Sequence, residues 1–247
     1  MLNFSFYMPK EIIQGQEVVT RNGDRFKQFG TRALIVTGKR SAQLSGAFQD
    51  VAAVLDNLGI SYQVFDQVEN NPSTTNVVQG AEAARQFNPD FIVGIGGGSA
   101  LDAAKAIAVL AVNDFAPECL YHGNYPNQPL PVIAIPTTAG TGSEVTQYSV
   151  LTIPEKQTKV GFGDRTIFPK VAFLDHRYTE SMELDTTRNT AVDALSHLVE
   201  AYLSRRASDA SDMLVEAGLK LWARALPDLK SAAFSSGMRD SLLTASA

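Results

Sequence analysis

Short apolar runs alternate with longer amphipathic stretches over the first two thirds of the chain. The first run, residues 33–37, is rich in aliphatic residues and stops at Gly38, which predicts a strand. In residues 44–58 the apolar positions recur every three or four residues as far as Gly59, which predicts a helix. The same alternation predicts strands at residues 61–65, 90–95 and 130–135 and helices at residues 74–87 and 100–112.

This order of elements predicts an α/β fold with a parallel sheet, because parallel neighbours need crossover connections and apolar strands need cover on both faces. Residues 4–20 alternate like a strand and are expected to add a hairpin, and residues 150–175 are β-rich. From residue 186 nearly every segment has helical period. We therefore expect an α/β nucleotide-binding domain at residues 1–176 and an all-helical domain at residues 177–247, incomplete because its pattern stops within a helix.

Composition narrows the class of protein. The 247 residues include 26 acidic and 21 basic side chains, a net charge of −5, and the basic residues form no stripe, which argues against nucleic acid as a partner. One cysteine, Cys119, and a start without the features of a secretory signal predict a cytoplasmic protein. The longest apolar helical stretch is too short to span a bilayer, so we expect no membrane segment.

A glycine-rich turn follows the third predicted strand, in the motif GGGSALDAAKA at residues 96–106. Consecutive glycines let the backbone approach a ligand closely, and the free N–H groups of a helix start attract an anion, so a phosphate or pyrophosphate fits here. The match to the dinucleotide fingerprint is imperfect, because the turn follows the third strand and no acidic residue follows at the expected spacing. A simple tight turn, with Ser99 as a helix cap, is the alternative.

A second small-residue loop, PTTAGTGSEVT at residues 136–146, follows the next predicted strand. Its hydroxyl groups and backbone donors suit a phosphate or a ribose, although exposed loops often have this composition. Both loops leave the carboxyl ends of strands in one predicted parallel sheet, which is where ligands bind in α/β proteins.

The third candidate is the pair Asp193 and His197 in a predicted helix. A spacing of four residues places both side chains on one helical face, where a carboxylate and an imidazole can share a divalent metal ion. On these two residues alone, a hydrogen-bonded surface pair is the simpler interpretation.

Together these segments resemble the iron-containing (group III) alcohol dehydrogenases. The resemblance rests on VTGK at residues 36–39, GGGSALDAAKA, PTTAGTGSEVT, and DALSHLVEAY at residues 193–202, in that order. It implies NAD(P)-dependent interconversion of a small alcohol with an aldehyde or ketone at a divalent metal, iron in most members and zinc in some. It also makes a homodimer an expectation by analogy.

Residue by residue, the resemblance implies two groups of functional side chains. The metal ligands would be Asp193 and His197, and Gly98 and Ser99 would lie at the pyrophosphate. The implied cofactor residues are Asn71, Gly97, Gly98, Ser99, Asp102, Thr137, Thr138, Thr141 and Lys159. Gly38 and Lys39, at the position expected to face the adenosine ribose, complete the predicted set.

The family's two later histidine ligands are absent from this sequence. The chain contains only His122, His176 and His197, and the first two match no ligand motif. Two ligands seldom hold iron or zinc, so a protein limited to these residues is expected to be defective in catalysis.

Cofactor choice is predicted from residues 38–40. Many members that resemble this segment carry Asp at the position of Gly38, where it repels a 2′-phosphate. Glycine removes that repulsion, and Lys39 and Arg40 could add positive charge, so we expect NADP(H) to be accepted at least comparably to NAD(H). Alternatively, both cations point to solvent and only end a strand.

Two other functions remain open at this stage. One is a catalytically silent dinucleotide-binding protein, because the sheet domain is whole and the metal set is not. The other is a related reductase such as maleylacetate reductase, which the motifs exclude less securely than dehydroquinate synthase.

Overall fold

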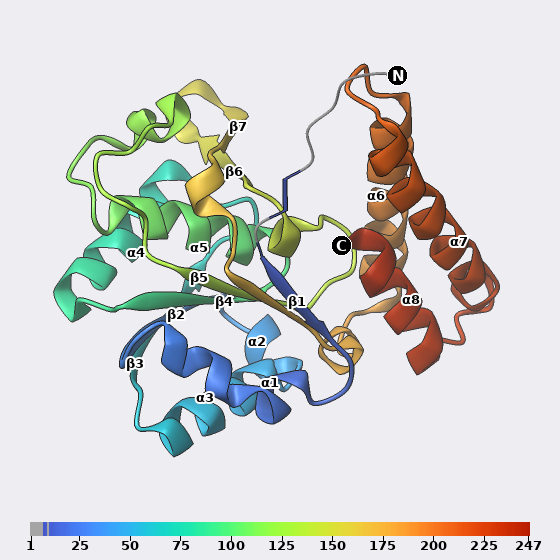
Figure 1. Cartoon of the computed structure of the whole chain (residues 1–247), viewed down its shortest axis with the longest axis horizontal. Helices are drawn as coiled ribbons and strands as arrows, with labels where there is room; N and C mark the ends of the chain where they lie inside the picture. Colours follow the sequence, from blue (N-terminus) through green and yellow to red (C-terminus); the bar gives the residue numbers. More distant parts are fainter. Residues whose placement is uncertain (1–6, 9) are drawn as a thin grey trace.

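A six-stranded parallel sheet forms the centre of the computed structural model, which describes residues 7–8 and 10–247 (Figure 1). Its order is β1-β8-β5-β4-β2-β3, and every neighbouring pair is parallel. The strands are β1 (Glu11–Gln14), β2 (Arg32–Gly38), β3 (Ser61–Val68), β4 (Phe91–Gly96), β5 (Val132–Pro136) and β8 (Val171–Leu174).

Apolar side chains on both faces of the sheet explain why helices cover both sides. In β2, Ala33 and Ile35 pack into one core, while Leu34 and Val36 pack into the other. All four are fully buried, and burial of the larger side chains, Leu34, Ile35 and Val36, contributes about 1.5–3 kcal/mol each. One face is covered by α1 (Val18–Arg21), α2 (Ser41–Leu44) and α3 (Ala47–Leu58), and the other by α4 (Thr74–Phe87) and α5 (Gly98–Leu110).

A separate antiparallel hairpin, β6 (Tyr148–Ile153) and β7 (Thr158–Gly163), lies beyond the α5 side of the main sheet (Figure 1). An isolated parallel bridge pairs Thr152 of β6 with Ser73, and hydrogen bonds from Ser149 and Val150 to Asp102 also join β6 to α5. Short 3-10 helices connect the elements, at Gly23–Gln28, Pro117–His122, Ser143–Val145, Pro154–Lys156, Arg165–Ile167 and His176–Thr179.

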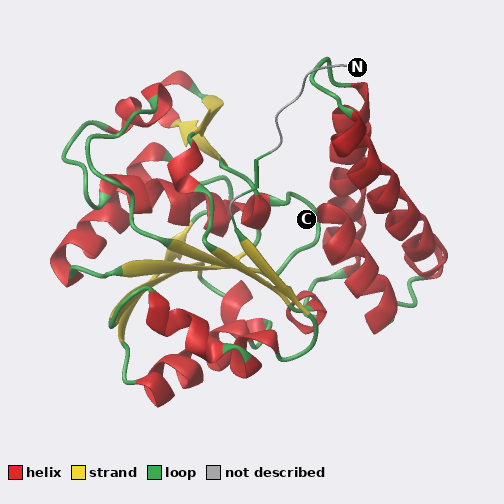
Figure 2. Ribbon diagram, viewed as in Figure 1, coloured by secondary structure: helices red, strands yellow, loops and turns green. Residues whose placement is uncertain are grey.

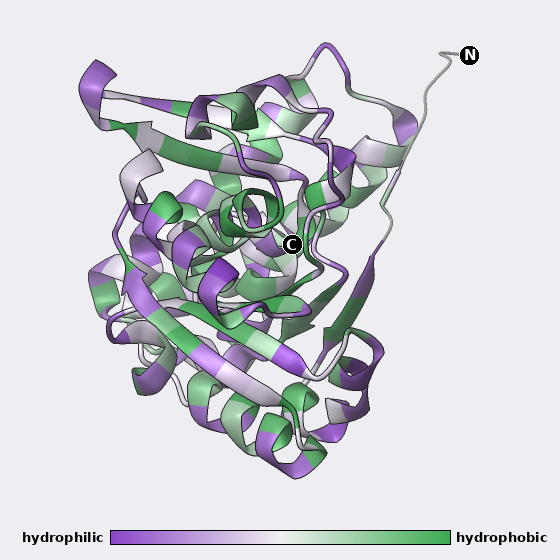
Figure 3. Cartoon of the chain, turned by 90° about the vertical axis from the view of Figure 1, so that its left-hand side faces the viewer, coloured by the Kyte–Doolittle hydropathy of each residue, from purple (hydrophilic) through white to green (hydrophobic). Residues whose placement is uncertain are grey.

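The last part of the chain is helical and stands beside the sheet edge, as the colouring in Figure 2 shows. It consists of α6 (Leu184–Leu203), α7 (Asp209–Ser231) and α8 (Ser236–Ser246). A third core joins these helices to the end of β8, where Leu174 packs with Leu229, Leu242 and Leu243. The expected α/β fold followed by helices is therefore confirmed, and Figure 3 shows the hydrophobic residues gathered on the strands and inward helix faces.

Two sequence expectations need correction. The hairpin expected at residues 4–20 is wrong where it can be judged: β1 pairs in parallel with β8 at the sheet edge, and α1 follows it. Residues 4–6 and 9 of that segment lie outside the described residues. The helix expected at residues 44–58 divides into α2 and α3, because Gly46 adopts a left-handed conformation with φ +82°.

Within residues 7–8 and 10–247, no helix has both the length and the apolar character needed to cross a membrane.

Candidate functional site

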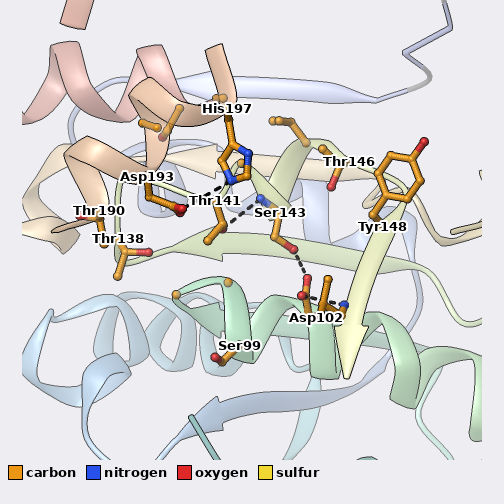
Figure 4. Close-up of a pocket in the computed structure, with 18 of the residues that line it drawn as sticks. Ser99, Asp102, Thr138, Thr141, Ser143, Thr146, Tyr148, Thr190, Asp193 and His197 are labelled. Atoms are coloured by element: carbon orange, nitrogen blue, oxygen red, sulfur yellow. Dashed lines mark hydrogen bonds and ion pairs between the residues drawn. The ribbon is translucent and has the colours of Figure 1, made fainter. Parts of the chain in front are cut away.

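A cavity of about 1220 Å³ lies where β2, β4, β5 and β8 end, between the sheet and the helices α6 and α7. It brings together residues that are far apart in sequence, and Figure 4 shows several of them converging on one space. The predicted site residues that line it are Gly38, Asn71, Gly97, Gly98, Ser99, Asp102, Thr137, Thr138, Thr141, Lys159, Asp193 and His197. Lys39 is exposed and does not line the cavity, and neither do His122 and His176.

The glycine turn forms a narrow cradle between two loops. Helix α5 begins at Gly98, and its N-cap, Gly97, provides no side-chain hydrogen bond, so the first N–H groups of the helix are available to a ligand. A Cβ atom added at Gly98 would lie 2.7 Å from Thr141 Oγ1, and one at Gly97 would lie 3.1 Å from Thr138 Oγ1. The two loops therefore approach each other as closely as they do only because these positions lack side chains.

Asn71 joins three segments around this cradle. Its backbone N–H donates to Ser99 Oγ over 3.1 Å, and its carbonyl accepts a 3.0 Å hydrogen bond from Thr152 Oγ1 in β6. Its side-chain Oδ1 accepts a 2.8 Å hydrogen bond from Lys159 Nζ in β7. These contacts require a left-handed backbone, with φ +57°, which asparagine tolerates better than most residues. Because Ser99 Oγ already accepts from Asn71, the Ser99 hydroxyl can donate its proton to an acceptor in the cavity.

Asp102, one turn further along α5, is bound by donors of the protein itself. Ser143 Oγ donates to one carboxylate oxygen over 2.6 Å, and the backbone N–H of Val150 donates to the other over 2.9 Å. Burial raises the pKa of Asp102 above its usual value, and Lys105, 3.8 Å away, opposes the shift. Asp102 thus reaches the cavity as part of a polar network, and its predicted role along the cofactor remains a prediction.

The pair Asp193 and His197 faces the same cavity from α6 (Figure 4). Asp193 Oδ1 lies 3.7 Å from His197 Nε2, and their side chains are 45% and 54% exposed. Carboxylate and imidazole are suitable donors for iron or zinc, and this separation lets both approach one ion. Within residues 7–8 and 10–247, however, no cluster of three or more His, Cys, Asp or Glu residues could hold a metal. The pair therefore fits part of a metal site and does not complete one.

Sequence reasoning missed the wall of the cavity nearest this pair. Tyr148 and Thr146 line it from the start of the hairpin, and Leu214 and Gly218 line it from α7. Only Gly218 carried a usable signal, because an isolated glycine inside a helix often marks close packing. A Cβ atom at that position would lie 2.6 Å from Leu198 Cδ2 on α6.

Comparison with known proteins gives matches to one family. The sequence model of the family described as "Iron-containing alcohol dehydrogenase" matches residues 9–176. The chain is 33% identical over 224 residues to a NAD-dependent methanol dehydrogenase of Bacillus methanolicus, covering 90% of this chain and 59% of that protein. It is 35% identical over 196 residues to a long-chain primary alcohol dehydrogenase of Thermoanaerobacter ethanolicus, covering 78% of this chain and 49% of that protein.

Solved structures agree with these matches. An iron-containing alcohol dehydrogenase from Thermotoga maritima superposes with a TM-score of 0.93 at 45% identity, covering 99% of this chain and 67% of that chain. A sulfoacetaldehyde reductase from Bifidobacterium kashiwanohense, solved in complex with NAD+, superposes with a TM-score of 0.91 at 31% identity, covering 100% of this chain and 65% of that chain. The present chain thus spans between half and two thirds of the length of these relatives.

Proposed function

Because this chain belongs to the iron-containing alcohol dehydrogenase family, we propose that it binds a nicotinamide dinucleotide in the cavity. With this cofactor it would take part in the NAD(P)-linked oxidation of an alcohol to an aldehyde or ketone and in the reverse reduction. The observation that carries the proposal is that the glycine cradle and the pair Asp193 and His197 line one continuous cavity. A cofactor anchored at the cradle can therefore extend toward the two candidate metal ligands.

The residues of the cradle would bind and orient the cofactor. The pyrophosphate would accept hydrogen bonds from the first N–H groups of α5 and from the Ser99 hydroxyl, and the positive end of the helix dipole favours its charge. Thr138 and Thr141, on the opposite loop, lie against the glycines and would close the other side of the cradle. Lys159 is held at the cavity by Asn71 and would supply a positive charge near the phosphates or the ribose.

The reacting centre would lie at the α6 side of the cavity. Asp193 and His197 would hold a divalent metal there together with at least one further ligand, since catalytic sites of this kind usually use three protein ligands. When bound, the metal would act as a Lewis acid on the substrate oxygen, and the nicotinamide would exchange a hydride with the substrate carbon. The contribution of the chain itself is orientation, because the cradle fixes one end of a long cofactor and so limits where its other end can react.

The substrate would be a small alcohol or the corresponding carbonyl compound. Leu198, Leu214 and Leu221 provide an apolar lining near Asp193 and His197, which suits the hydrocarbon part of such a molecule.

The test is a titration of the 247-residue chain with NADH and NADPH, followed by an alcohol oxidation assay with added Fe²⁺ or Zn²⁺. Saturable binding of a dinucleotide with metal-dependent turnover supports the proposal in full. Saturable binding without turnover at any metal concentration favours the second candidate, a catalytically silent dinucleotide-binding protein, which the two-ligand set also supports. Absence of any dinucleotide binding contradicts both.

A further inference from the structure

The order of the strands fixes the direction in which a bound dinucleotide would extend. The glycine cradle follows β4, and the pair Asp193 and His197 stands on α6, on the β8 side of the sheet (Figure 1). A nicotinamide directed at this pair leaves the adenosine to extend the other way, over the ends of β2 and β3. The cavity continues in that direction, and its lining there includes Gly38, Ser41, Val68 and Glu69. We call this part the outer end of the cavity.

The charge that lines the outer end is negative. Among the described residues, Glu69 is the charged side chain in this part of the lining, whereas Lys39 and Arg40 are exposed and do not line the cavity. Lys159 lines the cavity nearer the cradle, where its ammonium group is bound to Asn71. In the part of the chain that the structure describes, no cation forms an ion pair with Glu69. Its charge is therefore left for a ligand to meet.

Neighbouring contacts hold Glu69 just beyond the end of β3. Val68 pairs with Gly38 in the sheet, and a Cβ atom on Gly38 would lie 3.4 Å from Val68 O. The buried side chain of Asn76 accepts a 3.2 Å hydrogen bond from the Glu69 N–H. Ser73 Oγ donates to Glu69 Oε2 over 3.3 Å, and Oε1 accepts no hydrogen bond from the described residues. The carboxylate thus lies one residue past the point where β2 and β3 touch, with one oxygen able to accept from a ligand.

A carboxylate in this position distinguishes the two nicotinamide cofactors. The adenosine ribose of NAD(H) has 2′ and 3′ hydroxyl groups that can donate hydrogen bonds to a carboxylate, and many α/β dinucleotide-binding proteins use an acidic residue for this contact. NADP(H) carries a phosphate at the 2′ position. It therefore offers one donor fewer, and it brings a negative charge close to a second negative charge. The outer end favours the diol over the phosphate.

We propose that Glu69 is a specificity-determining residue that binds the adenosine ribose and makes NAD(H) the preferred cofactor over NADP(H). The inference rests on the proposed cofactor site, and it reverses the expectation drawn from residues 38–40. Gly38 leaves β2 without a carboxylate at the ribose, but the neighbouring strand β3 supplies one.

The test compares the dissociation constants of NADH and NADPH for the original protein and for Glu69→Gln, by fluorescence titration at one ionic strength. Glutamine keeps the size of the side chain and can still accept a hydrogen bond from Ser73, but it carries no charge. The original protein should bind NADH about tenfold or more tightly than NADPH. In Glu69→Gln this preference should fall by about tenfold, because the repulsion of the 2′-phosphate and the charge-assisted hydrogen bond to the ribose are lost together.

Glu82→Gln is the matched control, because it makes the same chemical change at an exposed glutamate of α4 that does not line the cavity. It should leave both dissociation constants unchanged. A melting curve of each variant shows whether it is folded. A general loss of structure would weaken both cofactors alike, so the ratio of the two dissociation constants is specific to the charge of Glu69.

Displacement of bound NADH by two smaller ligands locates the effect at the adenosine. Adenosine 5′-monophosphate and adenosine 2′,5′-bisphosphate differ only in the 2′-phosphate, and both lack the nicotinamide. The monophosphate should displace NADH from the original protein at lower concentration than the bisphosphate, and this difference should shrink in Glu69→Gln.

Two results would overturn the inference and leave the proposed function intact. One is an original protein that binds NADPH as tightly as NADH, and the other is a cofactor preference that Glu69→Gln does not change. Binding of neither cofactor by the original protein would instead refute the proposed function, and the inference with it.

Discussion

Replacing Gly98 by valine tests the cradle most directly. A Cβ atom at this position would lie 2.7 Å from Thr141 Oγ1 and 2.8 Å from Thr141 Cγ2, closer than side chains normally approach. Valine adds two further methyl groups that must also find space. Either Thr141 moves away from the cradle or the first turn of α5 shifts, and both changes displace the donors proposed for the pyrophosphate.

The expected size of the effect follows from the hydrogen bonds at risk. A hydrogen bond from a backbone N–H to a charged acceptor contributes about 1.5–3 kcal/mol, so loss of one such bond corresponds to a roughly 10- to 150-fold larger dissociation constant. Stability should fall less than affinity, because the first residue of a helix has no intrahelical N–H bond to lose.

NADH fluorescence titration of the original and Gly98→Val proteins measures the change. Gly237→Val is the matched control, since that glycine also lies in the first turn of a helix and a Cβ atom there would meet nothing within 4 Å. It should bind NADH like the original protein. An unchanged dissociation constant for Gly98→Val, in a variant that melts normally, would remove this turn from the cofactor site.

Three further predictions concern metal, cofactor choice and pH. With only Asp193 and His197 as ligands, the 247-residue chain, loaded with iron or zinc and dialysed, should retain much less than one ion per chain by elemental analysis; stoichiometric retention would refute this. Gly38→Asp should weaken the binding of NADPH by on the order of 1–3 kcal/mol and leave the binding of NADH less affected, because the new carboxylate would repel the 2′-phosphate. A Cβ atom fits at this position, 3.4 Å from the nearest atom, Val68 O. An equal change in the two dissociation constants would count against the prediction. Burial raises the pKa of Glu144 to about 7, so the free energy of unfolding should fall as pH rises from about 4.5 to 7. Relative to the original protein, Glu144→Gln should therefore gain on the order of 1–3 kcal/mol of unfolding free energy between pH 5 and 8, measured by urea unfolding. A difference between the two proteins that stays constant across that range would contradict the assignment.

Local pattern was sufficient to predict most of the sheet and its helices. The unbroken apolar run at residues 33–36 corresponds to two buried faces of β2, and helix α4 has the predicted bounds, because its cap Ser73 and its apolar spacing are both local. The edge strand β1 was misassigned, since an alternating segment near a chain start fits a hairpin as well as a strand whose partner lies about 160 residues away.

The candidate site was predictable only in part, for a related reason. The glycine cradle has a local signal, but the three contacts of Asn71 reach residues 28, 81 and 88 positions away, and only the family resemblance singled it out. Lys105 lies among small apolar residues of a helix, where a lysine usually extends to solvent. Its burial depends on Ser143 and Tyr148, 38 and 43 positions later, so no pattern within the helix could indicate it.

The pairing of β1 with β8 has a consequence for how the chain is made. Residues 11–14 meet residues 171–174, and the N–H of Glu17 donates to Asp175 just beyond them. At about 5–20 residues per second, a ribosome needs roughly 8–30 s to produce the partner of β1. Strands β2, β3 and β4 follow one another in sequence, and β2 pairs with both of the others, so these three can assemble during that interval. Strand β1 is thus synthesised long before its partner and is among the last of the described strands to join the sheet, and its edge position allows it to be added without reopening the strands already paired.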